Sequence, residues 1–414
     1  MKAIVIGGGI AGLSSAYYLQ QSGWDVTLID KTDLQDSCSY GNLGMIVPSH
    51  FVPLAMPGMI AQGIKWMFNS RSPFYVRPSL NMDLISWGLK FIKSATEKHV
   101  VKSAIPLRDI NLFSKHLYEE LAGKPGFDFD LEKKGIMMYF KTAKVAEEEI
   151  HLAHKAQSLG LDVVPVDKKQ AQLLEPEIEL DVLGAVHYRC DAHLYPNKLI
   201  TQLMAFLKHA GVTFETNAAV EKMTVENNKI KNVITKAGVF EADVVVAAAG
   251  SWLPALTKMA GVSLSLMPGK GYSFMQHTPE KKLHIPAIFC EARVAITPMN
   301  GSIRYGGTME IGPVNNKVNM KRVEGIVQSV SKYFSNVHIG MPAESEVWYG
   351  FRPCTPDGVP YIGRSKKISN LFIGGGHAMS GLSLGPATGR LIAELVNDKK
   401  TSIDITAFDP ERFS

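Results

Sequence analysis

The hydrophobic positions change their spacing twice within the first thirty residues. Residues 2–6 form an apolar, β-branched run that predicts a buried strand. Leu13, Ala16 and Leu19 then recur at helical spacing, and Gly23 is expected to end that helix. A second apolar run over 24–29 predicts another strand, which Asp30 follows directly. These residues therefore predict a strand–helix–strand unit.

The turn between the first strand and the helix has the spacing G-x-G-x-x-G, made by Gly7, Gly9 and Gly12. In dinucleotide-binding loops the first glycine allows a tight turn, the second lets the backbone approach a pyrophosphate, and the third lets helix and strand pack closely. The helix N-terminus offers free N–H groups to the phosphates, and Asp30 is placed to accept hydrogen bonds from a ribose. Because strand, glycines, helix and acid are in register, we predict a dinucleotide-binding unit.

The rest of the chain alternates between predicted helices and strands. Helical spacing predicts helices over 60–68, 84–92, 143–159, 196–210, 320–334 and 387–396. Strands are expected over 135–140, 212–215, 220–225, 302–309 and 371–373, and residues 230–237 and 239–246 are expected to complete a meander. The apolar run at 243–248 and the strand at 371–373 both lead into turns of small residues, which again allow a close approach to a ligand.

Composition and charge exclude several classes of protein. The chain has 414 residues, a net charge of +5 and no run of five basic residues, so nucleic acid is not an expected partner. No stretch of 18 apolar residues occurs, so no membrane-spanning helix is expected, and the glycine-broken start predicts no signal peptide. His187, Cys190 and His193 have ligand-like spacing but no fourth ligand nearby, so no metal is expected. The cysteines are far apart, which predicts free thiols at Cys38, Cys190, Cys290 and Cys354.

Several motifs, in order along nearly the whole chain, resemble the D-amino-acid oxidase superfamily of FAD proteins. The chain is most similar to bacterial D-amino-acid dehydrogenases of the small-subunit type and to hydroxyproline dehydrogenases and glycine oxidases. The most specific segments are GFRPCTPDGVPYIGR (350–364) and GGGHAMSGLSLGPATGRLIAEL (374–395). The others are VIGGGIAGLSSAYYL (5–19), SYGNLGMIVP (39–48), IKWM (64–67), DAHLYPNKL (191–199), DVVVAAAGSW (243–252) and PGKGYSF (268–274).

This resemblance implies a mixed α/β fold. A Rossmann-like FAD-binding domain is interleaved with a substrate domain built on a mostly antiparallel sheet with helices. The FAD-binding domain is expected at 1–50, 143–262 and 345–414, and the substrate or cap domain at 51–142 and 263–344. FAD is expected to be held non-covalently, because Cys354 is offset from the cysteine of the sarcosine oxidase motif.

The resemblance also implies roles for single residues. Arg352 takes the place of the arginine that pairs with the substrate carboxylate, and a salt bridge to Asp357 is the alternative. Tyr272 is a candidate second contact to the carboxylate or amine, with a place in the core as the alternative. His50 is expected to be a solvated loop histidine rather than a substrate contact. Contacts to FAD are expected from Gly7, Gly9, Ile10, Ala11, Gly12, Asp30, Lys31, Asn42, Gly44, Met45, Val220, Ala249, Gly250, Gly376, His377, Gly381, Leu382 and Ser383, although His377 has simple packing as its alternative.

The implied reaction is the oxidative deamination of a D-amino acid by hydride transfer from Cα to flavin N5. The products are an imine and then a 2-oxo acid, and the electrons are expected to pass to a quinone or another carrier. The alternatives are a dehydrogenase of D-hydroxyproline, a cyclic imino acid, a glycine- or sarcosine-type oxidase that uses O₂, and a flavin-binding structural subunit of a hetero-oligomeric complex. The expected location is the cytoplasm. Peripheral contact with the inner face of the cell membrane through residues 52–68 is left open, against a lid or core helix pair.

Overall fold

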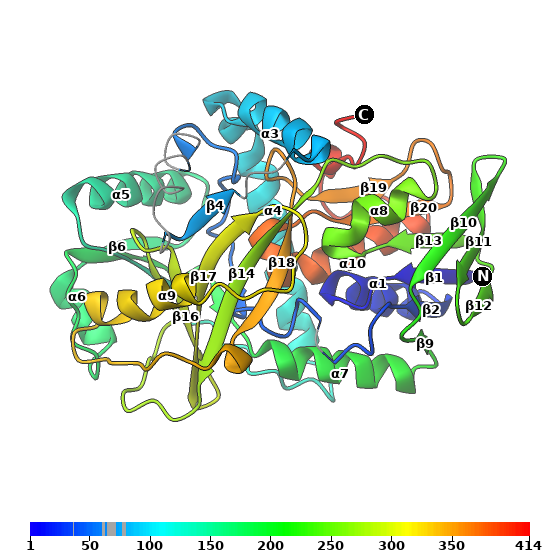
Figure 1. The fold of residues 1–414 in the computed structure, drawn as a ribbon. Helices are drawn as coiled ribbons and strands as arrows, with labels where there is room; N and C mark the ends of the chain where they lie inside the picture. The colour runs from blue at the N-terminus through cyan, green and yellow to red at the C-terminus, as the bar shows by residue number, and fades with distance from the viewer. Residues whose placement is uncertain (36, 60–62, 64–71, 77–79) are drawn as a thin grey trace.

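Two sheets lie side by side and organise the molecule (Figure 1). The computed structural model describes residues 1–35, 37–59, 63, 72–76 and 80–414. Within these residues the smaller sheet has six strands and lies on the right of Figure 1, while the larger sheet has nine strands and lies at the centre and left. Helices from distant parts of the sequence pack on both sheets, which confirms the expected mixed fold.

The six-stranded sheet is built from apolar strands. Its order is β19 (Tyr361–Arg364), β20 (Leu371–Gly375), β13 (Val244–Ala247), β1 (Lys2–Ile6), β2 (Asp25–Ile29) and β9 (Thr213–Glu215). All neighbours pair in parallel except β19 and β20. Parallel sheets are covered on both faces, and accordingly every residue of β13 and β20 is buried. In such folds ligands bind beyond the carboxyl ends of the strands, where Gly7, Asp30 and Ala248 follow β1, β2 and β13.

Glycines bring the helices α1 (Ile10–Gln21) and α10 (Gly381–Val396) into close contact. A Cβ at Gly385 would lie 2.5 Å from the side chain of Ile10, and a Cβ at Gly389 would lie 2.4 Å from the backbone of Ser14. The prediction that this helix starts at 387 is wrong, since it starts at Gly381. The small residues before 387 are part of the helix and serve its packing.

A proline inside α10 has a tertiary partner for the hydrogen bond that it removes. Pro386 has no N–H, so the carbonyl four residues earlier, at Leu382, loses its helical donor. The hydroxyl of Tyr118 donates to that carbonyl at 2.6 Å. Tyr118 belongs to α4 (Glu97–Ala122), so this bond also ties α4 to the helices of the small sheet.

The nine-stranded sheet is mostly antiparallel. Its order is β18 (Trp348–Cys354), β14 (Met267–Gln276), β17 (Ser302–Ile311), β16 (Val294–Met299), β15 (Ala287–Phe289), β5 (Ile136–Phe140), β7 (Gly184–Tyr188) and β6 (Val163–Asp167), with β4 (Phe74–Val76) beside β17. Within the described strands of this sheet, only the pairs β15–β5 and β17–β4 are parallel. α9 (Met320–Tyr333) packs on this sheet, where Val323, Ile326 and Val330 join its apolar core.

Two parts of the expected FAD-binding segments belong instead to the larger sheet. Residues 143–188 contain α5 (Ala143–Ser158), β6, α6 (Lys168–Leu174) and β7, and β7 pairs with β5. β18 likewise pairs with β14. The expected meander is also shorter, because residues 239–246 divide between β12 (Gly238–Phe240) and the parallel strand β13. Apolar strands do not reveal which sheet they join, because register is set by partners distant in the sequence.

The remaining elements are α3 (Met82–Ser94), α7 (Pro196–His209), α8 (Leu253–Lys258), β3 (Met45–Ile46), β8 (Ala192–His193), β10 (Val220–Glu226) and β11 (Lys229–Thr235), with short 3₁₀ turns at Gly250–Trp252, Glu344–Glu346, Ala378–Ser380 and Thr406–Phe408. Among them, α3, α7, β10 and β11 lie where the periodicity predicts them, while α8, β3 and β8 are short elements that it does not predict. The predicted helix at 60–68 and the motif at 64–67 lie outside the described residues except for Gly63.

Candidate active site

A cavity of about 1450 Å³ lies where the two sheets meet. Small-molecule pockets in proteins usually measure about 300–1,000 Å³, so this one has room for a dinucleotide and a substrate together. The walls include the glycine loop after β1, the turn after β13 and the first turn of α10 from one side, and strands β14, β16, β17 and β18 from the other. Most of the predicted site residues border it: Gly7, Gly9, Ile10, Ala11, Asp30, Lys31, Asn42, Met45, Val220, Ala249, Gly250, Tyr272, Arg352, His377, Gly381 and Leu382.

The glycine loop after β1 has the shape that a pyrophosphate requires. Gly7 has φ +111°, and a Cβ at Gly12 would lie 1.8 Å from the carbonyl oxygen of Gly7, so neither position accepts a side chain. A Cβ at Gly9 would meet nothing closer than 3.7 Å. The N–H groups of Gly9 and Ala11 border the cavity without a protein partner among the described residues. They are therefore open to a phosphate at the N-terminus of α1.

The carboxylate of Asp30 accepts a hydrogen bond from this loop and so fixes its conformation. The backbone N–H of Gly8 donates to Asp30 Oδ2 at 2.6 Å, and the N–H and hydroxyl of Thr32 both donate to Oδ1 at 2.8 Å. Asp30 also borders the cavity, so it serves the loop conformation and faces the expected ribose position. Beyond it, the ammonium group of Lys31 lies 3.2 Å from the ring centroid of Trp252.

Three predicted flavin contacts shape the cavity wall without bordering the cavity. Gly44 has φ +71°, and a Cβ there would lie 2.0 Å from the carbonyl oxygen of Leu194. Gly376 has φ +74°, and its Cβ would lie 2.6 Å from Thr355. Ser383 accepts a hydrogen bond from the N–H of Val47 at 3.0 Å, which fixes the loop after β3 against α10.

Two buried side chains brace the cavity wall, one at residues 40–42 and one at α10. The guanidinium of Arg304, which the sequence did not single out, donates to the carbonyls of Tyr40 and Asn42. The ring of His377 is buried, and its Nε2 bonds to the hydroxyl of Thr388 at 2.8 Å. Burial lowers the pKa of His377 to about 4, so the ring is neutral at physiological pH. His377 thus both packs on α10 and borders the cavity, as both of its alternatives require.

Arg352 lies across the face of the larger sheet, held by a β-bulge. The register of β14 and β17 shifts between Lys270 and Tyr272, and Thr308 sits in that bulge with φ +64°, an unusual value for a β-branched residue. The guanidinium of Arg352 donates to the carbonyl of Thr308. A Cβ at Gly271 would lie 2.4 Å from the same guanidinium, so only glycine leaves room for it.

The alternative role for Arg352 fails, because its expected partner is taken. Asp357 pairs with Arg412 through two hydrogen bonds of 2.7 and 2.8 Å. No acidic side chain among the described residues pairs with Arg352. Burial lowers the pKa of Arg352, which means that the cavity is a poorly solvated place for a lone cation. An anionic ligand there would relieve that cost.

The surroundings of Tyr272 favour its alternative role, since the residue is buried in the apolar core of the larger sheet. Tyr272 alternates with Gly271 along β14, so its ring points to the opposite face of the sheet from Arg352. Its hydroxyl donates to Glu310 Oε1 at 3.0 Å and accepts from the N–H of Asn319 at 3.2 Å. The hydroxyl therefore has partners within the protein, which favours the core role, while the contact of Tyr272 to the substrate stays a prediction. The alternation of side chains along β14 separates the two positions, because Gly271 faces Arg352 and Tyr272 faces the other side.

The expectation that His50 is a solvated loop histidine is wrong. His50 belongs to a group of residues in the cavity wall that the sequence did not bring together. His50 is half-buried, borders the cavity, and bonds through Nδ1 to Ser49 Oγ at 3.1 Å. Ser49 donates in turn to the fully buried carboxylate of Asp191 at 2.6 Å. Arg293 borders the same part of the cavity from the turn between β15 and β16. No local sequence pattern joins these residues, which lie far apart in the chain.

The comparisons with known proteins agree with this architecture. A family model described as FAD dependent oxidoreductase (DAO) matches residues 2–395. The chain belongs to the DAO family. A D-amino acid dehydrogenase of Helicobacter pylori is 28% identical over 410 residues, which cover 98% of each chain, and one of Vibrio vulnificus is 30% identical over 416 residues, which cover 97% of each. A crystal structure of glycine oxidase from Geobacillus kaustophilus has a TM-score of 0.79 at 23% identity and covers 99% of this chain and 98% of that one.

This DAO-family chain is an FAD-dependent oxidoreductase, and its cavity fits that cofactor. The open N–H groups of Gly9 and Ala11 suit the pyrophosphate, and Asp30 suits the ribose. Cys354 does not border the cavity among its described lining residues, and its Sγ contacts the carbonyl of Arg352 at 3.4 Å. Non-covalent attachment of FAD stays a prediction that this placement supports.

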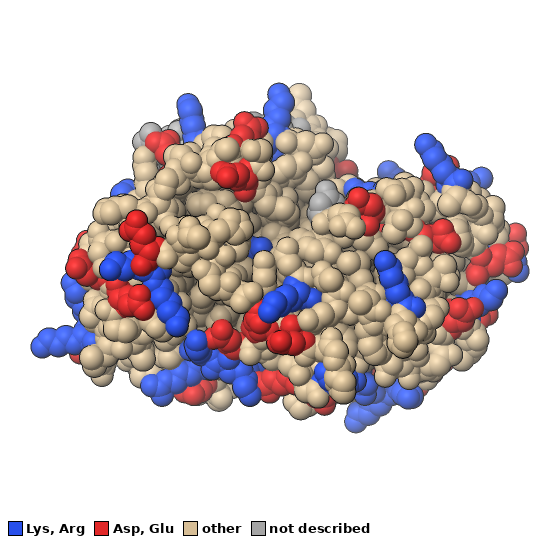
Figure 2. Space-filling model, turned by 90° about the horizontal axis from the view of Figure 1, so that it is seen from below, with Lys and Arg blue, Asp and Glu red and all other residues tan. Residues whose placement is uncertain are grey.

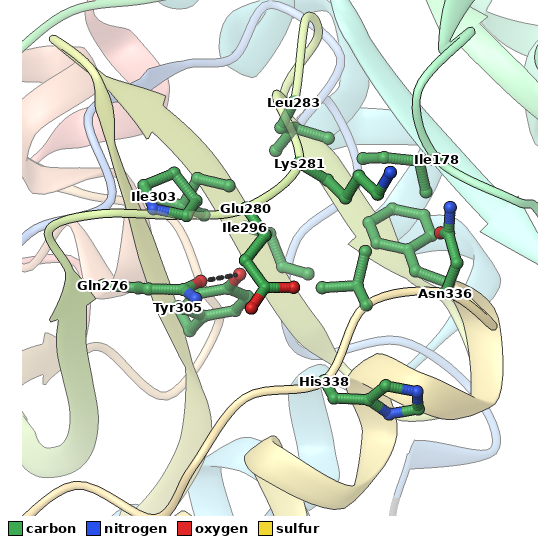
Figure 3. A pocket seen from close by; sticks show the side chains of 13 residues that line it. Ile178, Gln276, Glu280, Lys281, Leu283, Ile296, Ile303, Tyr305, Asn336 and His338 are labelled. Carbon is green, nitrogen blue, oxygen red and sulfur yellow. Dashed lines mark hydrogen bonds between the residues drawn. The ribbon is translucent and has the colours of Figure 1, made fainter.

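Other features of the described residues lie apart from this site. A cavity of only about 20 Å³ lies beside the bond between the Tyr305 hydroxyl and Gln276, and it holds no more than a water (Figure 3). Charges of both signs are mixed over the face shown in Figure 2, without a continuous basic field. Within the described residues, no helix is long and apolar enough to cross a membrane, and no three side chains of the metal-binding types gather as a metal site requires.

Proposed function

We propose that this protein oxidises the α-amino group of a D-amino acid and passes the electrons to a quinone or another carrier. The observation that carries the proposal is Arg352, a cation in the cavity wall with no acidic partner among the described residues. A planar guanidinium binds a carboxylate through two parallel hydrogen bonds, which orients an amino acid as well as holding it. The D-amino acid dehydrogenases among its relatives support the same substrate class.

The chain's own residues provide binding, orientation and exclusion of water. FAD, when bound, supplies the acceptor for the hydride. Gly7, Gly9, Ala11 and Asp30 would hold its ADP half, while Asn42, Met45, Gly381 and Leu382 would line its flavin. Thr308 fixes one edge of the Arg352 guanidinium, so the substrate carboxylate is left with the other nitrogens. The imine formed by oxidation needs only water to give a 2-oxo acid.

The proposal is tested by mixing the yellow holoenzyme with single substrates without oxygen and recording the flavin absorbance. The panel contains several D-amino acids, their L-enantiomers, glycine, sarcosine and cis-4-hydroxy-D-proline. Bleaching by D-amino acids at the highest kcat/KM supports the proposal. Preference for hydroxyproline or for glycine and sarcosine would replace it with one of those activities, and no bleaching by any compound would overturn it. Dye reduction compared with peroxide release then identifies the acceptor class.

We also propose that α3 contacts an anionic membrane surface. Met82, Ile85, Leu89 and Ile92 recur along one side of α3, and Met82 and Leu89 are 74% and 65% exposed. Val101 and Ile105 are exposed on α4, where Lys98 and Lys102 share their side of the helix. Exposed apolar side chains beside lysines are the pattern of a helix that lies on anionic lipid.

The membrane proposal is tested by sedimentation with vesicles. The holoenzyme should sediment with vesicles of phosphatidylglycerol and phosphatidylcholine and much less with phosphatidylcholine alone. Leu89→Glu should weaken that binding about tenfold or more, because it removes an exposed leucine that the lipid would bury and adds a charge of the same sign as the lipid. Leu173→Glu, at an exposed leucine of α6, is the matched control and should leave binding unchanged. Equal binding by wild type and Leu89→Glu would contradict the proposal.

A further inference from the structure

A chain of hydrogen bonds leads from the cavity into the protein interior. His50 Nδ1 lies 3.1 Å from Ser49 Oγ, and Ser49 Oγ lies 2.6 Å from Asp191 Oδ2. The backbone N–H of Ser49 also donates to Asp191 Oδ1 at 2.9 Å, and the thiol of Cys190 lies 3.5 Å from the same oxygen. His50 and Ser49 border the cavity, while Asp191 is completely buried. The chain therefore joins a ring in the cavity wall to a carboxylate that water does not reach.

The hydrogen bonds determine the tautomer of His50. An ionised Asp191 only accepts, so the single proton of the Ser49 hydroxyl is donated to it. Ser49 Oγ must then accept from His50, which places the ring proton on Nδ1. His50 Nε2 consequently carries a lone pair, and it has no hydrogen-bond partner among the described residues. A base with a free lone pair thus borders the cavity.

His50 and Arg352 both border the cavity, and the paired strands β16 and β17 connect their surroundings. Arg293 is close enough to His50 to influence its protonation, and Val294, the next residue, pairs with Gly307 across β16 and β17. The residue after Gly307 is Thr308, whose carbonyl accepts from Arg352. Arg293 and Thr308 are therefore opposite each other, with His50 near the first and Arg352 bonded to the second.

The substrate must lose a proton before it can be oxidised. An amino acid carries an ammonium group at neutral pH, and its nitrogen has no free lone pair to stabilise the carbon from which hydride leaves. The proposed function therefore needs an acceptor for one proton near the carboxylate-binding arginine. Resting on that function, we propose that His50 takes the proton from the substrate ammonium and that Ser49 and Asp191 carry it away from the cavity.

The transfer balances in protons and charge. One N–H bond of the ammonium breaks, its electron pair stays on the amine nitrogen, and the proton forms a new bond to His50 Nε2. His50 gives its Nδ1 proton to Ser49 Oγ, and the Ser49 hydroxyl proton passes to the Asp191 carboxylate. The ammonium and the carboxylate both become neutral, and the imidazole ends in its other tautomer. No oxidant or further reactant takes part in this step.

The charges around the chain suit each end of it. Burial, together with the charge of Arg293, lowers the pKa of His50 to about 4, so the ring is neutral and able to accept at pH 7. Burial raises the pKa of Asp191 to about 7, against the opposing effect of Lys115, so the carboxylate can hold a proton near neutral pH. Glu148, Glu149 and His151 of α5 and Tyr188 of β7 also border this part of the cavity. Burial raises the pKa of Glu149, while Arg293 lowers it.

The test compares His50→Gln with His154→Gln, at an exposed histidine of α5 that is not among the described residues lining the cavity. The rate of flavin bleaching at saturating D-amino acid is measured without oxygen from pH 6 to pH 10. His50→Gln should bleach about 10²-fold more slowly at pH 7 and recover as rising pH supplies the neutral amine. His154→Gln should match the wild type throughout. An unchanged pH profile in His50→Gln would overturn the relay.

Two further measurements separate the relay from a structural role. Wild-type bleaching should fall about tenfold per pH unit below about pH 7, where Asp191 is protonated. Asp191→Asn and Ser49→Ala should both lose that inflection, and Ser49→Ala, which should keep its full flavin content, carries the test if Asp191→Asn does not fold. Nitrogen NMR of the imidazole should show the Nδ1–H tautomer above pH 7, and a ring that titrates near its ordinary pKa would contradict the proposal. If the wild type itself is not bleached, the proposed function fails rather than the relay.

Discussion

The two ends of the large cavity are built in opposite ways. At the end where FAD is expected, called here the cofactor end, residues 7–12 and Asp30 lie within one strand–helix–strand unit, and mostly backbone faces the cavity. At the end where we propose that the substrate binds, the cavity is lined by His50, Arg293 and Arg352, which come from three distant segments. At the first end, a side chain added at Gly7 or Gly12 would clash with backbone atoms. At the second end, the position of the side chains depends on strand register. Substitutions at the two ends should therefore fail in different ways.

The largest effect is expected at the cofactor end, from Gly12→Ala. The new Cβ would lie 1.8 Å from the carbonyl oxygen of Gly7, and no flexible side chain is available to move aside. We expect protein that is purified without FAD and unfolds at a lower temperature, measured by flavin absorbance per protein and by thermal unfolding. Gly88→Ala, in α3 with nothing within 4 Å of its Cβ, should keep its FAD. Full flavin content in Gly12→Ala would contradict this account of the loop.

Arg352→Lys should produce the second largest effect, and a different one. Lysine keeps the charge but loses the planar fork, and the loss of a buried bidentate pair typically costs about 2–5 kcal/mol. We expect kcat/KM for the best substrate to fall about 10²–10³-fold while flavin content stays complete. Arg189→Lys, at an exposed arginine after β7, is the control. Normal kcat/KM in the Arg352→Lys protein would contradict the role of Arg352 in substrate binding, on which the proposed function rests.

The contrast between the two ends also explains what the sequence could predict. Gly7, Gly12 and Asp30 were predicted by spacing, because one local unit brings them together. The bulge at Thr308 was not, since it arises from the pairing of β14 with β17. Asp191 looks like an ordinary loop acid in the sequence, and only the fold, in which β3 pairs with β8, brings it to Ser49 and buries it. The sequence predicts that helix α10 begins at 387, because its first glycines resemble a loop. In the structure the helix begins at Gly381, and its glycines serve packing.

Gly271→Ala should have a moderate effect that passes entirely through Arg352. The Cβ would lie 2.4 Å from the guanidinium, which is the mobile end of a long side chain, so the fold should survive while the arginine shifts. We expect KM to rise about tenfold with a smaller change in kcat. In a double-mutant cycle, adding Gly271→Ala to Arg352→Lys should cost little more than Arg352→Lys alone. Additive losses would mean that Gly271 acts on something other than Arg352.

The smallest effect on catalysis is expected from Tyr272→Phe, which tests whether strand alternation separates substrate contacts from core. Its hydroxyl bonds to Glu310 and Asn319 on the face of β14 that points away from Arg352. Removing it should leave KM within about twofold and lower the free energy of unfolding by about 1 kcal/mol, measured by denaturant titration. Tyr305→Phe, which removes the bond to Gln276 at the small cavity, should behave alike. A tenfold rise in KM for Tyr272→Phe alone, at unchanged stability, would mean that this hydroxyl contacts the substrate and that strand alternation does not separate the substrate contacts from the core.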